Sequence, residues 1–532
     1  MIKGFRQIVS LTFISRVFGM LRDVAYAAFL GADAISDAWF IAFKIPNLAR
    51  RLFGEGAASA SFIPVYSKVL KEDMHRADRL ANTVVTVVFV FLSALVLLAW
   101  TGIYIFRISR DTTHDTDLIL SLCSVMLPYT VMICTVAILA GILNVHRHFA
   151  APAAAPIVLN IFIITAVLLT GWAFRIDKEV QLFYIAACVL VAGSVQLVMQ
   201  LVPMKKAGIS IRPDFNVGCD DFKKVIFLMA PMIIGLTATQ INTLADDFIA
   251  WFFSGSDQKA ETLEFLGRQM QFPLRRGSVT YLYLAQRLYQ LPLGVIGISL
   301  ATAIFPIMSE EAARKDYKAL STTISKGINT AVFIALPATV GLLLVARPLI
   351  VVLFERREFL PEDTAATSYT LLFYSIGITG FFAQQILSRA FYSLHKPVVP
   401  TLSAVLAVFV NVVLNLTLVW PLGTGGLALS TAICSYLQVT IMLTVLGKTL
   451  GPDIFEGFVS NIVKSLTGTV IIGLVGLAVL LITEGLPKGS GASAFEVARL
   501  VLIVVICVSL YTLTAKILHN KMLSIITGNK KR

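Results

Sequence analysis

Runs of about twenty apolar residues recur from one end of this 532-residue chain to the other, and mostly short polar segments separate them. A helix of about 20 apolar residues is long enough to cross the hydrocarbon core of a bilayer. The composition agrees, because 57% of the residues are hydrophobic and only 14% carry a charge. The sequence therefore predicts an all-α polytopic membrane protein without a separable soluble domain.

About fourteen transmembrane helices are predicted. Their approximate ranges are 7–29, 34–66, 81–106, 117–145, 152–174, 180–203, 222–253, 278–309, 328–354, 364–393, 398–420, 424–447, 458–483 and 494–517. The first range imitates a signal peptide, but Arg16 and Arg22 interrupt its apolar run, so we expect it to be retained as a span.

The Lys and Arg residues are distributed unevenly between the alternating loops. With the N-terminus inside, 24 of the 44 fall on the cytoplasmic side, 12 on the outer side and 8 at membrane depth. Because cytoplasmic loops are enriched in positive charge, both termini are predicted to be cytoplasmic. The net charge of +13 is explained in this way. The sequence has no basic stripe interleaved with aromatic residues, which is the pattern that would indicate binding of single-stranded nucleic acid.

The chain also resembles itself at two nearly equal offsets. Residues 59–64 align with 301–306 at an offset of 242, and the segment 138–152 echoes 386–400 at an offset of 248. Such echoes are typical of transporters built from repeated halves. We expect two related six-helix lobes, residues 1–211 and 212–450, followed by two additional helices and a basic cytoplasmic tail in residues 451–532.

Charged residues interrupt the apolar sequence between Phe13 and Tyr66. They are Arg16, Arg22, Asp23, Asp37, Lys44, Arg50, Arg51 and Glu55. A charge at the centre of a spanning helix costs roughly 2.5–3.5 kcal/mol on insertion scales, so such residues usually face a water-filled cavity or a partner. Positive charges outnumber negative ones here, which favours a cationic cavity for an anionic ligand such as pyrophosphate. The alternative is that these charges pair with one another to fix the packing of the helices.

The segment from Ala34 to Tyr66 is too long for one straight span, and we expect it to bend near Pro46 and the Gly54–Gly56 sequence. Helical spacing then places several of its charged residues on one stripe, to the extent that the bend preserves the phase. These residues are Asp37, Lys44, Arg51 and Glu55.

Other polar residues lie at membrane depth in the second half of the chain. Arg287 occupies about the position there that Lys44 occupies in the first half. Asp246 lies in one predicted span, Asn411 and Asn415 lie four residues apart in another, and Thr431 lies in a third. Their oxygen atoms are of the kind that a hard monovalent cation accepts, and interhelical hydrogen bonding is the alternative.

Other functions find little support. The six cysteines are scattered singly, five of them in apolar runs, and are interpreted as small buried hydrophobic residues. The pair His146 and His148 is a weak candidate for a metal site. No catalytic or nucleotide-binding motif is present, so the chain is not expected to be an enzyme. The polar segment 255–276 is expected to be an outer loop, in part helical.

Several stretches resemble the MurJ/MviN family of lipid II flippases. Ser15 to Asp23 reads SRVFGMLRD, and Ser36 to Ala58 reads SDAWFIAFKIPNLARRLFGEGAA. The resemblance continues in Phe62-Ile-Pro64, in Gly277-Ser-Val, in Gln286-Arg-Leu and in Phe391-Tyr-Ser.

The resemblance implies a two-lobed fold of the multidrug/oligosaccharidyl-lipid/polysaccharide exporter superfamily. It also implies that the chain moves lipid II, the undecaprenyl-pyrophosphate-linked peptidoglycan precursor, between the leaflets of the bacterial cytoplasmic membrane by alternating access. The expected partners are lipid II, membrane lipids and proteins of cell-wall synthesis or division. The last two spans would hold the prenyl tail.

The family's functional residues map onto named positions of this chain. Arg16, Arg22, Arg51 and Arg287 would contact the substrate, accompanied by Asp37, Lys44, Arg50 and Glu55. A sodium ion, the one ligand implied besides the substrate, would bind at Asp246, Asn411, Asn415 and Thr431. This chain departs from the family at Gln286 and Asn415, where acidic residues occur in other members.

Two alternatives remain open. The chain could export another polyprenyl-linked glycan or drugs, and drug exporters would need fewer cations at membrane depth. It could instead be a membrane scaffold that recruits enzymes of wall synthesis without transporting anything.

Overall fold

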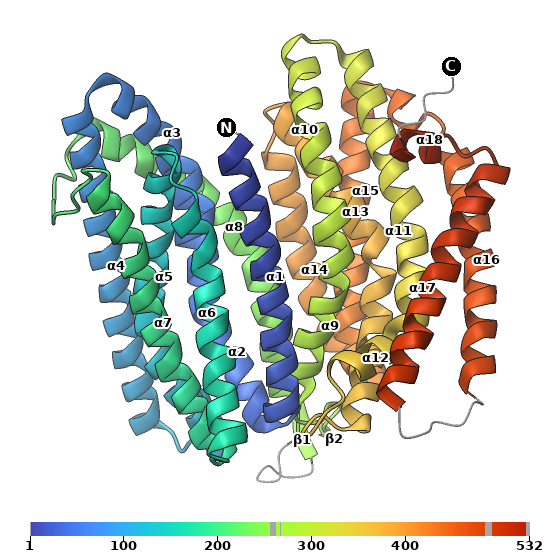
Figure 1. Cartoon of the computed structure of the whole chain (residues 1–532), viewed down its shortest axis with the longest axis horizontal. Coiled ribbons are helices and arrows are strands. Elements are labelled where there is room, and N and C mark those ends of the chain that lie inside the picture. Colours follow the sequence, from blue (N-terminus) through green and yellow to red (C-terminus); the bar gives the residue numbers. More distant parts are fainter. Residues whose placement is uncertain (1, 256–261, 266–267, 485–491, 528–532) are drawn as a thin grey trace. The chain divides into compact units, whose positions relative to one another are not determined.

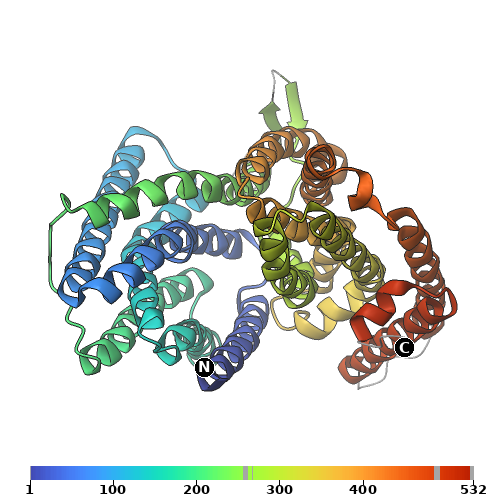
Figure 2. The ribbon, with the colours of Figure 1, turned by 90° about the horizontal axis from the view of Figure 1, so that it is seen from above.

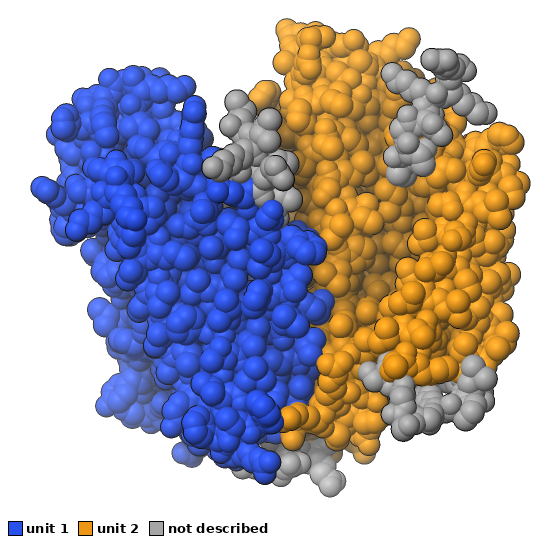
Figure 3. Space-filling model, in the orientation of Figure 1, with its two compact units in different colours: residues 1–244, 256–258 blue, residues 245–255, 259–532 orange. Residues whose placement is uncertain are grey.

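The computed structural model describes residues 2–255, 262–265, 268–484 and 492–527. Helices dominate this part of the chain, as the apolar periodicity predicts, because a helix satisfies its own backbone hydrogen bonds inside a bilayer (Figure 1). The chain divides into two compact units, which Figure 3 colours separately. Unit 1 comprises residues 1–244 and 256–258, and unit 2 comprises residues 245–255 and 259–532. The three-part division predicted from the sequence stays a prediction.

Unit 1 contains the first seven long helices and the greater part of an eighth. Its elements are α1 (Ile2–Leu30), α2 (Ala34–Ala49), a π-helical segment η1 (Arg50–Gly56), α3 (Ala57–Glu72), α4 (Met74–Ser109), α5 (His114–Val145), α6 (Ala150–Leu168), a π-helical segment η2 (Leu169–Ala173), α7 (Lys178–Lys206) and α8 (Asp220–Phe252). The helix α8 continues into unit 2 beyond Leu244.

Unit 2 contains the remaining helices. Its elements are a hairpin of β1 (Thr262–Phe265) and β2 (Arg268–Gln271), α9 (Ser278–Pro292), a π-helical segment η3 (Leu293–Gly297), α10 (Ile298–Ala313), α11 (Tyr317–Leu353), α12 (Pro361–Ile376), α13 (Ile378–Ser393), α14 (Val398–Leu422), α15 (Thr424–Leu450), a 3-10 turn η4 (Pro452–Phe455), α16 (Phe458–Glu484), α17 (Ala492–Ile517) and α18 (Lys521–Thr527). The helices α16 and α17 pack against each other and against α11, at the C-terminal edge of this unit (Figure 2).

Ten helices of the described chain are long and apolar enough to cross a membrane, or eleven if α12 and α13, which meet at a bend of 44°, form one span. The predicted all-α membrane fold is therefore confirmed, whereas the count of fourteen is not. The other three predicted spans coincide with α1, with α2 and α3, and with α8. These helices, with the segment η1, carry the charged residues singled out in the sequence except Arg287, which lies on α9.

The interior of unit 1 is largely apolar, and large apolar side chains are also exposed on its surface. One core cluster joins α3, α4 and α5 through Phe62, Leu80 and Ile142, all nearly inaccessible. Elsewhere on α4, large side chains such as Phe89 and Leu98 are exposed. An apolar exposed band of this kind suits contact with lipid tails.

The two predicted sequence echoes coincide with matching local structure. The π-helical segment η1 separates α2 from α3, and η3 separates α9 from α10, 241 to 243 residues later. Arg147 and His395, which are 248 residues apart, both adopt positive φ angles just after a helix, at 63° and 56°. The bend expected near Gly54–Gly56 is thus an interruption by π-helical turns.

One expectation about the loop 255–276 is wrong. Its described residues form an antiparallel hairpin in which Thr262 pairs with Gln271 and Phe265 pairs with Arg268, with no helix. Residues 256–261 and 266–267 of this loop lie outside the described residues. The polar and apolar residues of Thr262–Phe265 alternate, and this period of two is the pattern of a strand.

Candidate functional site

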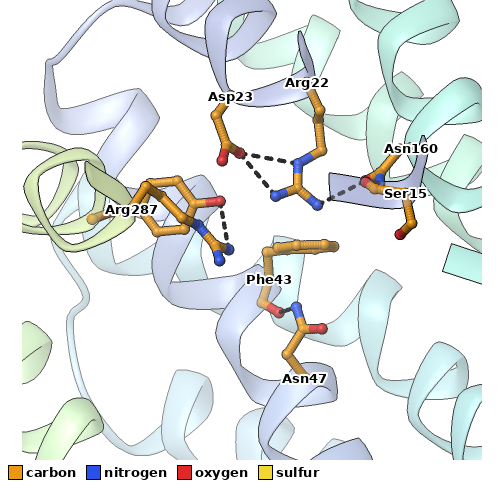
Figure 4. A network of polar contacts seen from close by, with 8 residues as sticks. Ser15, Arg22, Asp23, Phe43, Asn47, Asn160 and Arg287 are labelled. Atoms are coloured by element: carbon orange, nitrogen blue, oxygen red, sulfur yellow. Dashed lines mark hydrogen bonds and ion pairs between the residues drawn. The ribbon is translucent and has the colours of Figure 1, made fainter. Parts of the chain in front are cut away.

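The charged residues of α1 behave differently from one another. The Arg22 guanidinium donates to Asp23 Oδ1 through Nε at 3.1 Å and Nη2 at 2.8 Å, and to Asn160 Oδ1 on α6 through Nη1 at 3.0 Å (Figure 4). It also lies against the rings of Tyr26 and Phe43, 5.7 and 5.8 Å from their centroids. Arg22 and Asp23 are only 7% and 3% exposed, so this ion pair is buried inside unit 1. Charge pairing, the alternative for this stretch, therefore describes Arg22.

Arg16 lies six residues, about one and two-thirds turns, before Arg22 on the same helix and is exposed. Helical geometry puts the two side chains about 120° apart, because six residues of about 100° each fall about 120° short of two full turns. The structure thus gives the two arginines of α1 different surroundings.

Two charged residues of the segment Ala34–Tyr66 contact α8. Lys44 Nζ donates to the carbonyl oxygen of Thr243 at 2.9 Å, and Arg51 Nη1 donates to Gln240 Oε1 at 3.3 Å. Gln240 and Thr243 are three residues apart on α8, so Lys44 and Arg51 contact one face of that helix. Their common stripe survives the π-helical segment at least as far as Arg51, which remains exposed.

The other members of this set have less accessible or undescribed side chains. Asp37 is fully buried near the start of α2, and Arg50 is partly buried. The side chain of Glu55 lies outside the described residues. Unit 1 therefore presents exposed or partly exposed cationic groups at Arg16, Lys44, Arg50 and Arg51, and this charge suits an anionic ligand.

In unit 2, Arg287 lies midway along α9 and is partly buried. Its Nη2 donates to the hydroxyl oxygen of Tyr283 at 3.0 Å, and its guanidinium carbon lies 4.7 Å from the centroid of that ring (Figure 4). Tyr283 precedes Arg287 by one helical turn, so its ring and hydroxyl can hold the guanidinium in place through a cation–π contact and a hydrogen bond. The neighbouring Gln286 donates from Nε2 to the hydroxyl oxygen of Tyr374 at 2.9 Å.

The four residues of the predicted sodium site come together in unit 2. Asn415 Nδ2 donates to Asp246 Oδ1 at 2.6 Å and to Asn411 Oδ1 at 2.9 Å. Thr431 Oγ1 donates to Asp246 Oδ2 at 3.3 Å and receives a bond from Asn411 Nδ2 at 3.4 Å. Asp246, Asn411 and Asn415 are at most 1% exposed. The four residues grouped from the sequence therefore lie together in the structure. They are joined by interhelical hydrogen bonds, which was the alternative to a sodium site.

Two further polar residues have structural contacts. His146 Nε2 shares a hydrogen bond of 2.8 Å with the hydroxyl of Tyr66, and burial lowers the pKa of the imidazole. Arg389 Nη1 donates to Thr302 Oγ1 at 2.7 Å, which joins α13 to α10. No group of three or more His, Cys, Asp and Glu residues in the described chain is arranged to hold a metal ion.

Sequence reasoning did not identify several partners of these charges. Asn160, Gln240 and Tyr374 are polar residues inside predicted spans, and that position alone is a signal of interhelical contact. Asn160 lies 138 residues from its partner Arg22, Gln240 lies 189 from Arg51, and Tyr374 lies 88 from Gln286. Helical periodicity, which relates residues within one helix, cannot predict these pairs.

Comparisons with known proteins agree on one family. The sequence model of the family described as "Lipid II flippase MurJ" matches residues 26–502. A "Probable lipid II flippase MurJ" of Vibrio cholerae serotype O1 is 32% identical over 446 residues, which cover 81% of this chain and 80% of that protein. A protein of the same description from Rhizobium tropici is 29% identical over 542 residues, covering 100% of this chain and 97% of the relative.

Solved structures share the fold. One titled "Lipid II flippase MurJ, inward closed conformation" gives a TM-score of 0.71 at 23% identity and covers 95% of this chain and 98% of the other. An inward-facing multidrug resistance MATE transporter of the MOP superfamily gives 0.66 at 13% identity and covers 84% and 98%. These likenesses establish a transporter fold, and the family model and the Vibrio cholerae relative settle the family. The chain belongs to the MurJ family of lipid II flippases.

Proposed function

We propose that this chain is an integral membrane protein that flips lipid II from the inner to the outer leaflet of the bacterial cytoplasmic membrane. The observation that carries this proposal is the family match over residues 26–502. The apolar helices of the described chain supply the membrane location. The family is one of transporters, and the substrate follows from its description.

We propose that cationic side chains bind the pyrophosphate of lipid II. Arg51, Arg16 and Lys44 in unit 1 are exposed or partly exposed, and Arg287 in unit 2 is oriented by Tyr283. Guanidinium groups suit pyrophosphate because their forked donors match its oxygens. Arg22, Asp37, Arg50 and Glu55 would accompany them, with Arg22 acting mainly through its bonds to Asp23 and Asn160.

A sodium ion at the Asp246 cluster would couple transport to an ion gradient. The donor set fits, because one carboxylate, two amide oxygens and one hydroxyl lie within a single hydrogen-bonded cluster, and hard cations accept such oxygens. The Asn415 amide would turn its oxygen toward the ion, since its nitrogen bonds to Asp246 here. A bound ion would supply coupling to its gradient, and the membrane potential adds about 2.3 kcal/mol per charge per 100 mV.

We propose that alternating access carries the headgroup across the membrane. The chain would expose its cations to one leaflet at a time, and α16 and α17 would accommodate the prenyl tail beside α11. Both termini would lie in the cytoplasm, as the distribution of Lys and Arg residues favours.

The decisive experiment measures lipid II translocation in bacteria depleted of their own flippase. Leaflet-resolved labelling of lipid II would report transport by the wild-type chain and by the variants Arg51→Ala and Arg287→Ala. Each variant removes charge-assisted hydrogen bonds worth about 1.5–3 kcal/mol, so transport should fall about tenfold or more. Arg347→Ala, which removes an exposed arginine of α11, is the matched control and should transport normally.

The outcomes separate the proposed function from the proposed site. A wild-type chain that moves no lipid II would disprove the function. Normal transport by both Arg51→Ala and Arg287→Ala would leave the function intact and exclude these arginines as the pyrophosphate ligands.

A further inference from the structure

The linker 207–219, which joins α7 to α8 at the edge of unit 1, contains no helix or strand (Figure 2). Two of its backbone N–H groups bond to side chains of α4. That of Arg212 donates to Asn82 Oδ1 at 3.1 Å, and that of Asp214 donates to Thr86 Oγ1 at 3.0 Å. Asn82 and Thr86 lie one turn apart and are buried. They fix the linker along α4 and satisfy backbone donors that would otherwise need water.

The ends of the helices on either side of the linker pack together. Ile209 of the linker belongs to the same core cluster as Met204 of α7 and Phe222 of α8. Arg76 on α4 also donates to both carboxylate oxygens of Asp221, through Nε at 2.6 Å and through Nη2 at 2.9 Å. The linker is therefore held in a defined place by three helices of unit 1.

Two large apolar side chains of the linker are exposed. Phe215 is 65% exposed and Val217 is 50% exposed. The residue before Phe215 bonds to Thr86, which lies twelve residues, or about 18 Å, from the start of α4. Three residues further along α4, Phe89 is exposed in the apolar band that suits lipid tails. Phe215 therefore lies close to the depth at which α4 begins to face lipid.

Basic side chains flank these apolar residues. All five Lys and Arg residues between positions 205 and 224 are exposed, namely Lys205, Lys206, Arg212, Lys223 and Lys224. The same stretch holds three carboxylates, of which Asp221 is paired with Arg76 and Asp214 accepts from the backbone N–H of Asn216 at 3.0 Å. Exposed apolar groups beside an excess of positive charge are typical of surfaces that bind a membrane interface.

We propose that the linker 207–219, with the basic ends of α7 and α8, binds anionic phospholipid headgroups of the cytoplasmic leaflet. Phe215 and Val217 enter the headgroup region, and the five cations contact lipid phosphates. In the proposed topology six spans precede the linker, so it meets the cytoplasmic leaflet, whose surface potential is negative. The inference rests on this membrane orientation and not on the transported substrate, and it concerns unit 1 alone.

The experiment measures which lipid lies beside the linker. In the full chain with its native cysteines replaced, Val217→Cys carries an NBD fluorophore, and the protein is placed in phosphatidylcholine nanodiscs. Nitroxide-labelled phosphatidylglycerol or nitroxide-labelled phosphatidylcholine is then added. A nitroxide quenches NBD on contact, so the ratio of the two quenching constants is the preference for the anionic lipid.

The expected preference follows from the charge of the surface. One Lys or Arg near an anionic surface strengthens binding roughly fivefold, so we expect a preference of at least about fivefold at low salt. At about 1 M salt, where the Debye length is about 3 Å, the preference should fall to about 1.

Two double variants separate this surface from other cytoplasmic charge. Lys223→Gln with Lys224→Gln removes two of the five cations and should bring the preference within about twofold of 1. Lys315→Gln with Lys318→Gln is the matched control, because it removes two exposed lysines beside the loop between α10 and α11 and should leave the preference unchanged. Phe215→Ser should weaken quenching by both lipids while the preference remains.

Each outcome supports or overturns the inference. Equal quenching by the two lipids at low salt, or an unchanged preference in Lys223→Gln with Lys224→Gln, overturns it. No quenching by either lipid overturns it as well and leaves the surface to an acidic protein partner. If the chain labelled at Val217 fails to fold, Asn216→Cys, at an exposed neighbouring position, carries the label and the same outcomes apply. None of these results depends on lipid II, so the proposed function is tested separately.

Discussion

The four arginines that the sequence groups together have unequal surroundings. Arg22 has three hydrogen bonds to side-chain oxygens and contacts two aromatic rings, whereas Arg16 and Arg51 are exposed. A residue held by so many partners cannot move toward a ligand without breaking them. Arg22 therefore contributes mainly to the packing of α1 on α6, and the exposed arginines are better suited to contact a substrate.

This difference predicts unequal losses of stability for two arginine substitutions. Arg22→Ala breaks the buried ion pair with Asp23 and should lower the free energy of unfolding by about 3–5 kcal/mol. Arg51→Ala removes an exposed group and should change it by less than about 0.5 kcal/mol. Denaturant titration of the purified protein in one detergent gives both values.

The double variant Arg22→Met with Asp23→Leu is the control, because it removes both charges and should recover most of the lost stability. If Arg22→Ala were as stable as the wild type, the buried pair would have no structural role.

The candidate residues could be found from the sequence, but their partners could not. A charge within an apolar run is visible without a structure, and the spacing of Lys44 and Arg51 predicts their common face. The bond from Arg22 to Asn160 joins residues 138 positions apart, and that from Asn415 to Asp246 joins residues 169 apart. Periodicity describes neighbours within one helix, and tertiary packing alone decides which helices meet.

At the scale of elements, a pattern of two helices joined by a π-helical segment occurs twice, as α2–η1–α3 and as α9–η3–α10. This pattern was only partly visible in the sequence. Pro46 and Pro292 each lie near the end of the first helix of their repeat, where the missing amide disturbs the hydrogen-bond ladder. The sequence therefore locates the break, but it cannot distinguish a kink from a π-helical segment. The hairpin at 262–271 was missed because four-residue strands carry too few residues for a clear period.

The close approach of α14 and α15 at Gly426 predicts the effect of a substitution on stability. At Gly426 on α15, an added Cβ would lie 2.2 Å from the backbone oxygen of Leu418 on α14. Gly426→Ala should therefore push apart the helices that carry Asn411, Asn415 and Thr431, and destabilise the protein by at least the 1–3 kcal/mol typical of overpacking.

Gly341→Ala is the matched control, because a Cβ on that α11 glycine meets nothing within 4 Å. Alanine is the better helix former, so this variant should be unchanged or more stable by up to about 1 kcal/mol. Thermal unfolding of both variants provides the test, and equal transition temperatures would contradict the close packing of α14 and α15.

At the scale of the whole molecule, apolarity and charge give different span counts. Ten or eleven helices of the described chain qualify by length and apolarity, and two of the other three predicted spans, at α1 and at α2 and α3, carry the charges that lie between Phe13 and Tyr66. Charges in a span are functional by default, so a count based on apolarity can omit helices such as α1 and α2 that bear on function. The number of spans matters because an even number returns the C-terminus to the side of the N-terminus.

Labelling of introduced cysteines decides between fourteen spans and eleven. In a chain whose six native cysteines are replaced, we would introduce Asp111→Cys, Asn216→Cys or Ser524→Cys, all at exposed positions. A membrane-impermeant maleimide should label position 111 in intact spheroplasts, because three spans precede it. Positions 216 and 524 should react only after permeabilisation, because six and fourteen spans precede them. If position 524 instead reacted in intact spheroplasts while 216 did not, the number of spans would be odd, and the charged helices could not all cross the membrane.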